Sequence, residues 1–229
     1  MKRFWTAVAV VEHGDSWSIA LDQRPLKTPA RATLAIPSIT LAEAVASEWR
    51  ACGEEIDPRT MPMTGLANAA QDHVAPDPAA FSASLARYAE ADLLCYRADH
   101  PAKLVAVQAA SWDQLLAWAR YRFDVDFVVG TGVVHLPQPF ATVARLAAAL
   151  PLDPHRLAAL SPLVTIGGSL VAALAVLEGA VAVDVVWDAV SLDERWQIEQ
   201  WGADDEAVAA LANRRADFAS AATFLTLVA

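Results

Sequence analysis

The amino-acid sequence predicts an α+β protein, in which a small N-terminal antiparallel β meander with a covering helix is followed by a larger all-α C-terminal domain. Three observations lead to this class. Residues 5–36 alternate apolar and polar side chains between turn-forming residues, as half-buried strands do. Residues 54–63 form a proline-punctuated connector, and from Leu66 onward apolar residues recur at helical spacing. We therefore expect two domains, residues 1–63 and residues 64–229.

The N-terminal elements follow from turn signals between short apolar runs. Three strands are expected, over residues 5–12, 16–21 and 30–36. Thr40 and Glu43 then have the T-x-x-E spacing of a capping box, which marks the start of a helix. This helix should cover one face of the meander and end by Gly53, because glycine commonly ends helices.

Helical periodicity organises the rest of the chain. Beyond the clean helix start at Asp77-Pro78, helices are expected over residues 103–122, 141–150, 154–160, 163–177, 185–190, 191–202 and 205–227. The uncharged stretch 157–177 is long enough to span a membrane, but its internal proline and glycines favour buried helices. We expect no membrane insertion. Since no apolar signal-peptide core follows Met1, we expect a cytoplasmic protein.

The composition argues for a globular protein and against nucleic acid as a partner. Hydrophobic residues make up 55% of the chain, charged residues 19%, and the formal net charge is -10. Such a chain is too apolar to be disordered, and its negative charge would be repelled by phosphate backbones. The only two cysteines, Cys52 and Cys95, lack the spacing of a metal or redox motif, so we expect reduced thiols.

Residues 191–202 gather the most informative side chains. Ser191 and Glu194 have the spacing of a second capping box, and Gly202 stands where a helix would end. Trp196 and Trp201 fall on different sides of that helix. A short helix with tryptophan on two sides either packs on both or keeps one ring for a partner.

Glu199 occupies an unexpected place on this helix. On a helical wheel it lies on the same stripe as Leu192 and Trp196. This stripe would be expected to face the apolar core, where a carboxylate is unusual. A buried carboxylate needs a partner, and Arg214 or Arg215 on the last helix would serve. We therefore expect Glu199 to be buried in an ion pair.

Catalytic residues are sparse. Glu199 and a second carboxylate beside Trp196 would suit a hydrolase with an aromatic sugar platform, and this is the alternative function. The acids at positions 204–206 are better explained as the first turn of the next helix, where negative charge is favourable. The five histidines are scattered, and the chain contains no H-E-x-x-H pair, phosphate-binding loop or G-x-S-x-G motif.

The segment Asp92-Leu93-Leu94-Cys95-Tyr96-Arg97 has two interpretations. Arg97 would stabilise a thiolate at Cys95 if this thiol were reactive. The more ordinary interpretation is a buried cysteine beside an Asp–Arg pair, and we prefer it. The residues taken alone therefore favour a binding protein whose acidic, tryptophan-bearing surface meets a partner.

Blocks of residues spread over nearly the whole chain carry a family resemblance. They include Lys2-Arg3-Phe4-Trp5, Leu21-Asp22-x-Arg24-Pro25-Leu26-Lys27-Thr28-Pro29, Gly53-Glu54-Glu55-Ile56-Asp57-Pro58, Asp92-Leu93-Leu94-Cys95-Tyr96-Arg97-Ala98, Trp112-Asp113-x-Leu115-Leu116 and Asp193-Glu194-x-Trp196-Gln197-x-Glu199-x-Trp201-Gly202. With these blocks the chain resembles the ATP12 family, assembly chaperones that act on the α subunit of the F-type ATP synthase head. It departs from the family pattern at Gln23, where glycine is usual, and at Ala203, where a charged residue is common.

This resemblance implies the two-domain fold and a function. The protein would bind the unassembled α subunit and shield it from aggregation until the β subunit joins. It would be bacterial and monomeric when free, and it would need no nucleotide, cofactor or metal of its own. The residues expected to contact the partner or shape its site are Glu194, Trp196, Glu199, Trp201, Asp204 and Glu206, with a second patch at Asp92, Tyr96 and Arg97.

Overall fold

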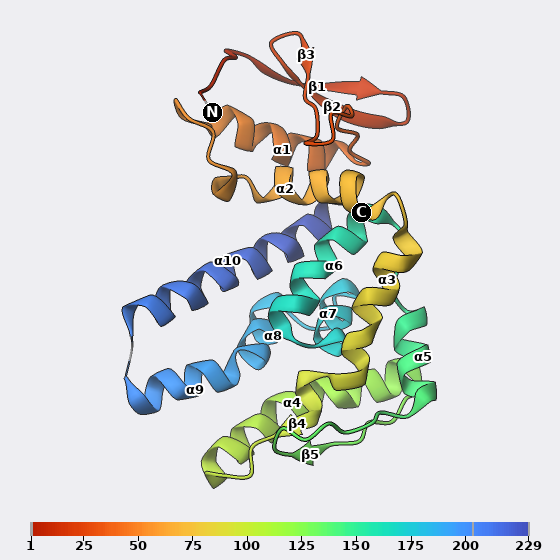
Figure 1. The fold of residues 1–229 in the computed structure, drawn as a ribbon, viewed down its shortest axis with the longest axis vertical. Helices are drawn as coiled ribbons and strands as arrows, with labels where there is room; N and C mark the ends of the chain where they lie inside the picture. Colours follow the sequence, from red (N-terminus) through yellow and green to blue (C-terminus); the bar gives the residue numbers. More distant parts are fainter. Residues whose placement is uncertain (1, 203, 229) are drawn as a thin grey trace. The chain divides into compact units, whose positions relative to one another are not determined.

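The computed structural model describes residues 2–202 and 204–228 and confirms the predicted α+β class (Figure 1). The chain forms two compact units. The first contains the residues up to Pro78, together with Leu152–Ala159 and the C-terminal residues from Ser220. The second contains Ala79–Pro151 and Leu160–Ala219. The division into domains at residues 63 and 64 stays a prediction.

The first unit is built on a three-stranded antiparallel sheet of β1 (Val8–His13), β2 (Ser16–Leu21) and β3 (Arg24–Pro25), in that order. Strand β1 begins at Val8, later than predicted. The reason is local: Asp22 Oδ1 accepts the main-chain N–H groups of Thr6 and Ala7 at 3.0 and 2.9 Å. These groups therefore bond to a side chain and not to a neighbouring strand.

The strand predicted over residues 30–36 is wrong. This segment makes only isolated bridges, Lys27 with Thr33 and Trp17 with Ile36. Arg31 adopts a left-handed φ of 69°, which interrupts extended backbone. Alternating apolar residues therefore place Leu34 and Ile36 in the core without forming a strand.

Helix α1 (Ile39–Ala51) packs against β1 and β2 through a buried face that includes Leu41, Val45 and Trp49. It starts two residues earlier than the predicted capping box, with Thr40 as its N-cap, implies. Ser38 is the N-cap, and its hydroxyl accepts the N–H of Leu41 at 3.2 Å. The hydroxyl of Thr40 instead donates to the carbonyl of Leu227, 3.1 Å away in the C-terminal segment of the same unit.

Helix α2 (Pro62–Ala69) follows a short 3₁₀ turn (Pro58–Thr60) and continues into a π-helical turn (Ala70–Val74). Its first turn is capped from α1. The Glu48 carboxylate accepts the N–H groups of Met63 and Thr64 at 2.7 and 2.8 Å and the Thr64 hydroxyl at 2.6 Å. This carboxylate satisfies donors that a helix start otherwise leaves unpaired.

The second unit is helical apart from two short parallel strands, β4 (Tyr96–Arg97) and β5 (Gly130–Thr131). The helices that contribute to it are α3 (Pro78–Ala86), α4 (Ala102–Phe123), α5 (Phe140–Ala148), α6 (Pro154–Gly167), α7 (Leu170–Leu177), α8 (Val183–Val190), α9 (Leu192–Trp201) and α10 (Asp205–Val228). Two 3₁₀ segments, Arg87–Ala91 and Leu93–Cys95, join α3 to β4.

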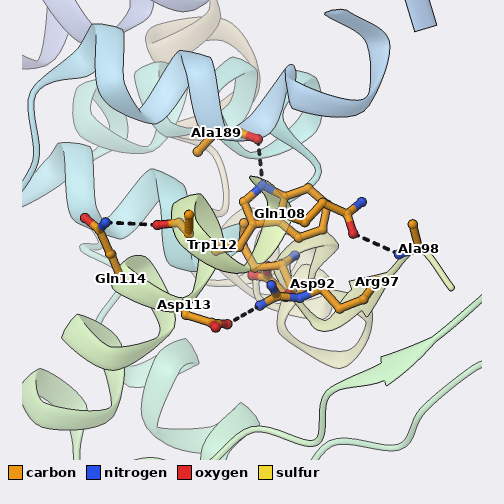
Figure 2. A network of polar contacts seen from close by, with 10 residues as sticks. Asp92, Arg97, Ala98, Gln108, Trp112, Asp113, Gln114 and Ala189 are labelled. Carbon is orange, nitrogen blue, oxygen red and sulfur yellow. Dashed lines mark hydrogen bonds and ion pairs between the residues drawn. The ribbon is translucent and has the colours of Figure 1, made fainter. Parts of the chain in front are cut away.

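The core of this unit lies where α4, α7 and α8 pack together. The first six residues of α7 are completely buried, and so is Trp112 of α4. The Trp112 indole nitrogen donates to the carbonyl of Ala189 at the end of α8, at 2.8 Å (Figure 2). Among the described residues, no helix is both long enough and apolar enough to cross a membrane.

The break between α6 and α7 differs from the predicted one. Sequence periodicity places it near Pro162, but α6 continues through this proline to Gly167. The chain turns at Gly168, whose φ is +64°, and Ser169 then caps α7 by accepting the N–H of Ala172 at 3.0 Å.

Candidate functional site

A cleft of about 580 Å³ lies in the second unit between α9 and the segment around β4, and we call it the α9 cleft. Tyr96 and Arg97 of β4, Leu104 and Gln108 of α4, and Val133 after β5 line one side. The α9 side is formed by Asp193, Trp196, Gln197, Gln200 and Trp201. The structure therefore brings together members of both residue groups that the sequence singled out, about one hundred residues apart: Tyr96 and Arg97 from one, and Trp196 and Trp201 from the other.

Arg97 lies at the base of the cleft and is only 9% exposed (Figure 2). Its guanidinium pairs with Asp113 at 2.7 Å, donates to the Leu94 carbonyl at 3.1 Å and lies 5.1 Å from the centre of the Trp112 ring. Because Asp113 balances its charge, the Arg97 side chain can stay buried and form part of the cleft wall. The predicted Asp–Arg pair exists, but the acid is Asp113 and not Asp92.

Gln108 joins the two sides of the cleft. This buried amide accepts the N–H of Ala98 at 2.8 Å and donates to Asp193 Oδ1 of α9 at 2.7 Å. Sequence reasoning missed Gln108, since a lone glutamine inside a long helix carries no recognisable signal. Asp193 belongs to one of the family blocks, but nothing in the residue pattern identifies Gln108 as its partner.

Asp92 is buried and does not reach the cleft surface. Its carboxylate accepts the N–H groups of Leu94 at 3.1 Å and of Val171 at 3.0 Å, so it joins the segment leading to β4 to the first turn of α7. Burial raises its pKa to about 6. We therefore revise the expected contact role of Asp92 to a positioning role beneath Tyr96 and Arg97.

Cys95 is buried, and burial raises its pKa to about 12. A thiol in this environment stays protonated at neutral pH and is a poor nucleophile. The interpretation of Cys95 as a reactive site is therefore wrong, and the buried-cysteine interpretation is correct.

The start of α9 is held by tertiary contacts and not by the predicted capping box. The Ser191 hydroxyl donates to the Trp187 carbonyl at 2.7 Å, because α8 leads into α9 across this single residue. Glu194 instead pairs with Arg214 of α10, which also donates to the Ile166 carbonyl at 3.1 Å. Glu194 thus lies on the α10 side of α9, in a smaller hollow of about 260 Å³.

Glu199 is exposed, and the expectation that it is buried and paired is wrong. Arg214 pairs with Glu194, and Arg215 lies 3.2 Å from Asp184. In α9 only Leu192 is buried, so the apolar stripe drawn on a helical wheel does not coincide with a core-facing side. Glu199 lines neither the α9 cleft nor the smaller hollow.

The two tryptophans of α9 both line the cleft but differ in exposure. Trp196 is half-buried, with Lys103 Nζ 5.4 Å from its ring centre. Trp201 is 79% exposed at the last position of α9. Beyond Gly202, Asp204 Oδ1 accepts the N–H of Glu206 at 3.2 Å, as expected for acids in a first helical turn.

This geometry defines a class of protein. Asp193 is the one carboxylate among the described residues that line the cleft, and it already accepts a bond from Gln108, whereas a glycosidase needs two free carboxyl groups. An exposed tryptophan beside a largely apolar hollow is instead typical of surfaces that bind other proteins. The α9 cleft therefore has the features of a protein-binding surface on a helical scaffold and not those of a glycosidase site.

Comparison with known proteins gives the family. Residues 2–120 match the model of the ATP12 chaperone protein. The chain is 40% identical to Atp12 from Paracoccus denitrificans, with a TM-score of 0.93 over 100% of this chain and 98% of that one. The Atu1473 protein of Agrobacterium tumefaciens is 38% identical, with a TM-score of 0.95 over 100% of this chain and 86% of that one. The chain belongs to the ATP12 chaperone family, which is a family of chaperones and not of enzymes.

Proposed function

We propose that this protein binds the unassembled α subunit of the F-type ATP synthase head and keeps it from aggregating until the β subunit joins. Membership of the ATP12 family is the observation that carries this proposal. A chaperone of this kind stabilises a state with exposed apolar surface and is displaced when a larger native interface forms. A cytoplasmic location and a monomeric free state are parts of the same proposal.

The α9 cleft is the proposed contact surface. Trp201 is 79% exposed and Val133 is 96% exposed, and both line the cleft. Large apolar side chains left in solvent beside a hollow are typical of partner-binding sites. Trp196 and Tyr96 would contact the α subunit inside the cleft, above the matched charge of Arg97.

The acidic residues around α9 form the proposed rim. Glu199, Asp204 and Glu206 are exposed, and Glu194 is half-buried in its pair with Arg214. Charged residues at a rim act mainly on the association rate and on its salt dependence. In this proposal the tryptophans supply affinity and the acids supply orientation.

Co-purification with the α subunit tests the proposal. The α subunit is expressed without its β subunit, alone or together with this protein, and the soluble complex is captured through a tag on the chaperone. Trp201→Ala should weaken capture by about fivefold or more, since tryptophans in interfaces often contribute over about 1 kcal/mol. Tyr121→Ala is the matched control, because Tyr121 is a 93% exposed aromatic residue of α4 that does not line the cleft.

The outcomes separate clearly. Capture that depends on Trp201 and not on Tyr121 supports the proposal and the site. If the wild-type protein neither captures the α subunit nor raises its soluble yield, the proposed function is refuted. Equal loss with both variants would refute the assignment of the cleft.

A further inference from the structure

We propose that the α9 cleft binds an extended peptide segment, with its backbone held by Gln197 and Gln200 and a basic side chain placed beside Trp201. This inference rests on the proposed function, because the segment would belong to the unassembled α subunit. It specifies which kind of structure the chaperone recognises: an unpaired stretch of chain and not a folded face.

The first argument is the arrangement of side chains along α9. Trp196 and Gln200 are four residues apart, and so are Gln197 and Trp201, so the helix presents two neighbouring rows that each combine an indole with a carboxamide. All four side chains line the cleft. Four residues of helix rise about 6 Å. Two residues of an extended chain span about 6.6 Å, so alternate residues of a bound strand would meet successive side chains of each row.

The second argument is the state of the carboxamides. Gln108 has both ends of its amide bonded inside the molecule and serves the fold. Gln197 and Gln200 are exposed, and neither side chain makes a hydrogen bond within the described part of the chain. An extended segment offers one N–H and one C=O per residue, which match a carboxamide. The middle of a bound helix would offer neither, because its backbone groups already pair with each other.

The third argument is charge. At the β4 side of the cleft the Arg97 guanidinium is already paired with Asp113, and the His100 imidazole lies beside the Asp99 carboxylate. Lys103 lies over the Trp196 ring. Near Trp201 in sequence, negative charge predominates, because the exposed acids Glu199, Asp204, Asp205 and Glu206 lie within a few residues of it. A lysine or arginine beside the exposed Trp201 ring would gain both cation–π and carboxylate contacts.

Peptide binding tests this inference. Dye-labelled 15-residue peptides that overlap along the α subunit are titrated with the full-length chaperone, and binding is followed by fluorescence anisotropy. Bound peptides should be apolar with a lysine or arginine, and they should lose at least about tenfold in affinity when that residue becomes glutamate. Methylation of the backbone nitrogens in a bound peptide should weaken binding to a similar extent. It removes the N–H groups that would donate hydrogen bonds to the carboxamide oxygens of Gln197 and Gln200.

The chaperone variants complete the test. Gln197→Ala and Gln200→Ala should each weaken peptide binding severalfold, while Gln114→Ala should not, because Gln114 is an exposed glutamine of α4 bonded only within its own helix. Circular dichroism of each variant shows whether it is folded, and a variant that unfolds is replaced by Gln→Ser at the same position. Unchanged affinity in folded Gln197 and Gln200 variants would overturn the inference.

Other occupants of the cleft give different results. Peptides that become helical on binding would overturn the extended geometry. Self-association of the chaperone that Trp201→Ala abolishes would assign the cleft to a second copy of this chain. If the whole α subunit is captured through Trp201 while none of the peptides binds, this inference fails and the proposed function stands. If neither the subunit nor a peptide binds, both fail.

Discussion

Replacing Gln108 with leucine should loosen the α9 cleft without emptying the core, because leucine is of similar size and apolar. The substitution removes two hydrogen bonds, from the Ala98 N–H at 2.8 Å and to Asp193 Oδ1 at 2.7 Å. A neutral bond contributes about 1 kcal/mol and a bond to a charged group about 1.5–3 kcal/mol. Asp193 is only half-buried, so water can replace part of its lost bond. We therefore expect the free energy of unfolding to fall by about 2–3 kcal/mol.

A double-mutant cycle with Asp193→Ala isolates the bond between the two side chains. Urea unfolding of the wild type, Gln108→Leu, Asp193→Ala and the double variant should give a coupling free energy of about 1–2 kcal/mol. Gln114→Leu serves as the control, because its side chain is exposed on the same helix, and a change within about 0.5 kcal/mol is expected there.

The same variants connect stability to function. Asp193 lies three and four residues before Trp196 and Gln197, on the same side of α9. If the Gln108–Asp193 bond positions this face, Gln108→Leu should reduce capture of the α subunit at temperatures where the protein is still fully folded. Two results would refute the reasoning. One is that the effects of Gln108→Leu and Asp193→Ala on the free energy of unfolding add within about 0.3 kcal/mol. The other is that Gln108→Leu captures as much α subunit as the wild type.

Three further predictions concern Glu48, which is half-buried, and the buried side chains of Asp92 and Cys95. Glu48→Gln should lower the free energy of unfolding, measured in urea, by about 2 kcal/mol, because it weakens three hydrogen bonds to the start of α2. Glu43→Gln is the control: Glu43 is exposed, and its substitution should change this free energy by less than about 0.5 kcal/mol. Burial raises the pKa of Asp92 from 3.8 to about 6, so the folded state binds a proton that the unfolded chain releases between these values. Its contribution to stability should thus decrease as the pH rises through this window, and Asp92→Asn should remove that slope from unfolding curves measured at pH 4 to 7. Cys95, whose pKa burial raises to about 12, should react with a thiol reagent only after unfolding, and rapid labelling of Cys95 in the native protein would contradict its buried position.

Local sequence signals predicted the elements whose formation depends on neighbours in the chain. The hairpin of β1 and β2 and the long helices α4 and α10 lie within a few residues of their predicted limits. In α10 Phe218, Ala222 and Leu225 are buried at helical spacing. In these elements hydrophobic periodicity and burial agree, so pattern alone was sufficient.

The site was harder to predict because distant contacts decide it. Gln108 and Asp193 are 85 residues apart in sequence, and Glu194 and Arg214 belong to different helices. The Ser191-x-x-Glu194 spacing predicts a local cap, but the Ser191 hydroxyl donates to the Trp187 carbonyl one turn earlier and Glu194 pairs with Arg214 of α10. A helical wheel placed Glu199 in the core because it assumes one buried stripe, which α9 lacks. The motif residues were found by resemblance, while their partners needed the structure.

The way α9 is held accounts for its free tryptophan. Among its ten residues only Leu192 is buried, so apolar packing contributes little to its position. The helix is instead fixed by polar links on two sides, from Asp193 to Gln108 and from Glu194 to Arg214. Both carboxylates lie near the N-terminus of α9, where negative charge interacts favourably with the helix dipole. The residues at the C-terminal end of α9 are therefore not needed to hold the helix in place. Trp201, Gln197 and Gln200 can therefore stay in solvent without loss of the fold, as the proposed binding and release of a partner would require.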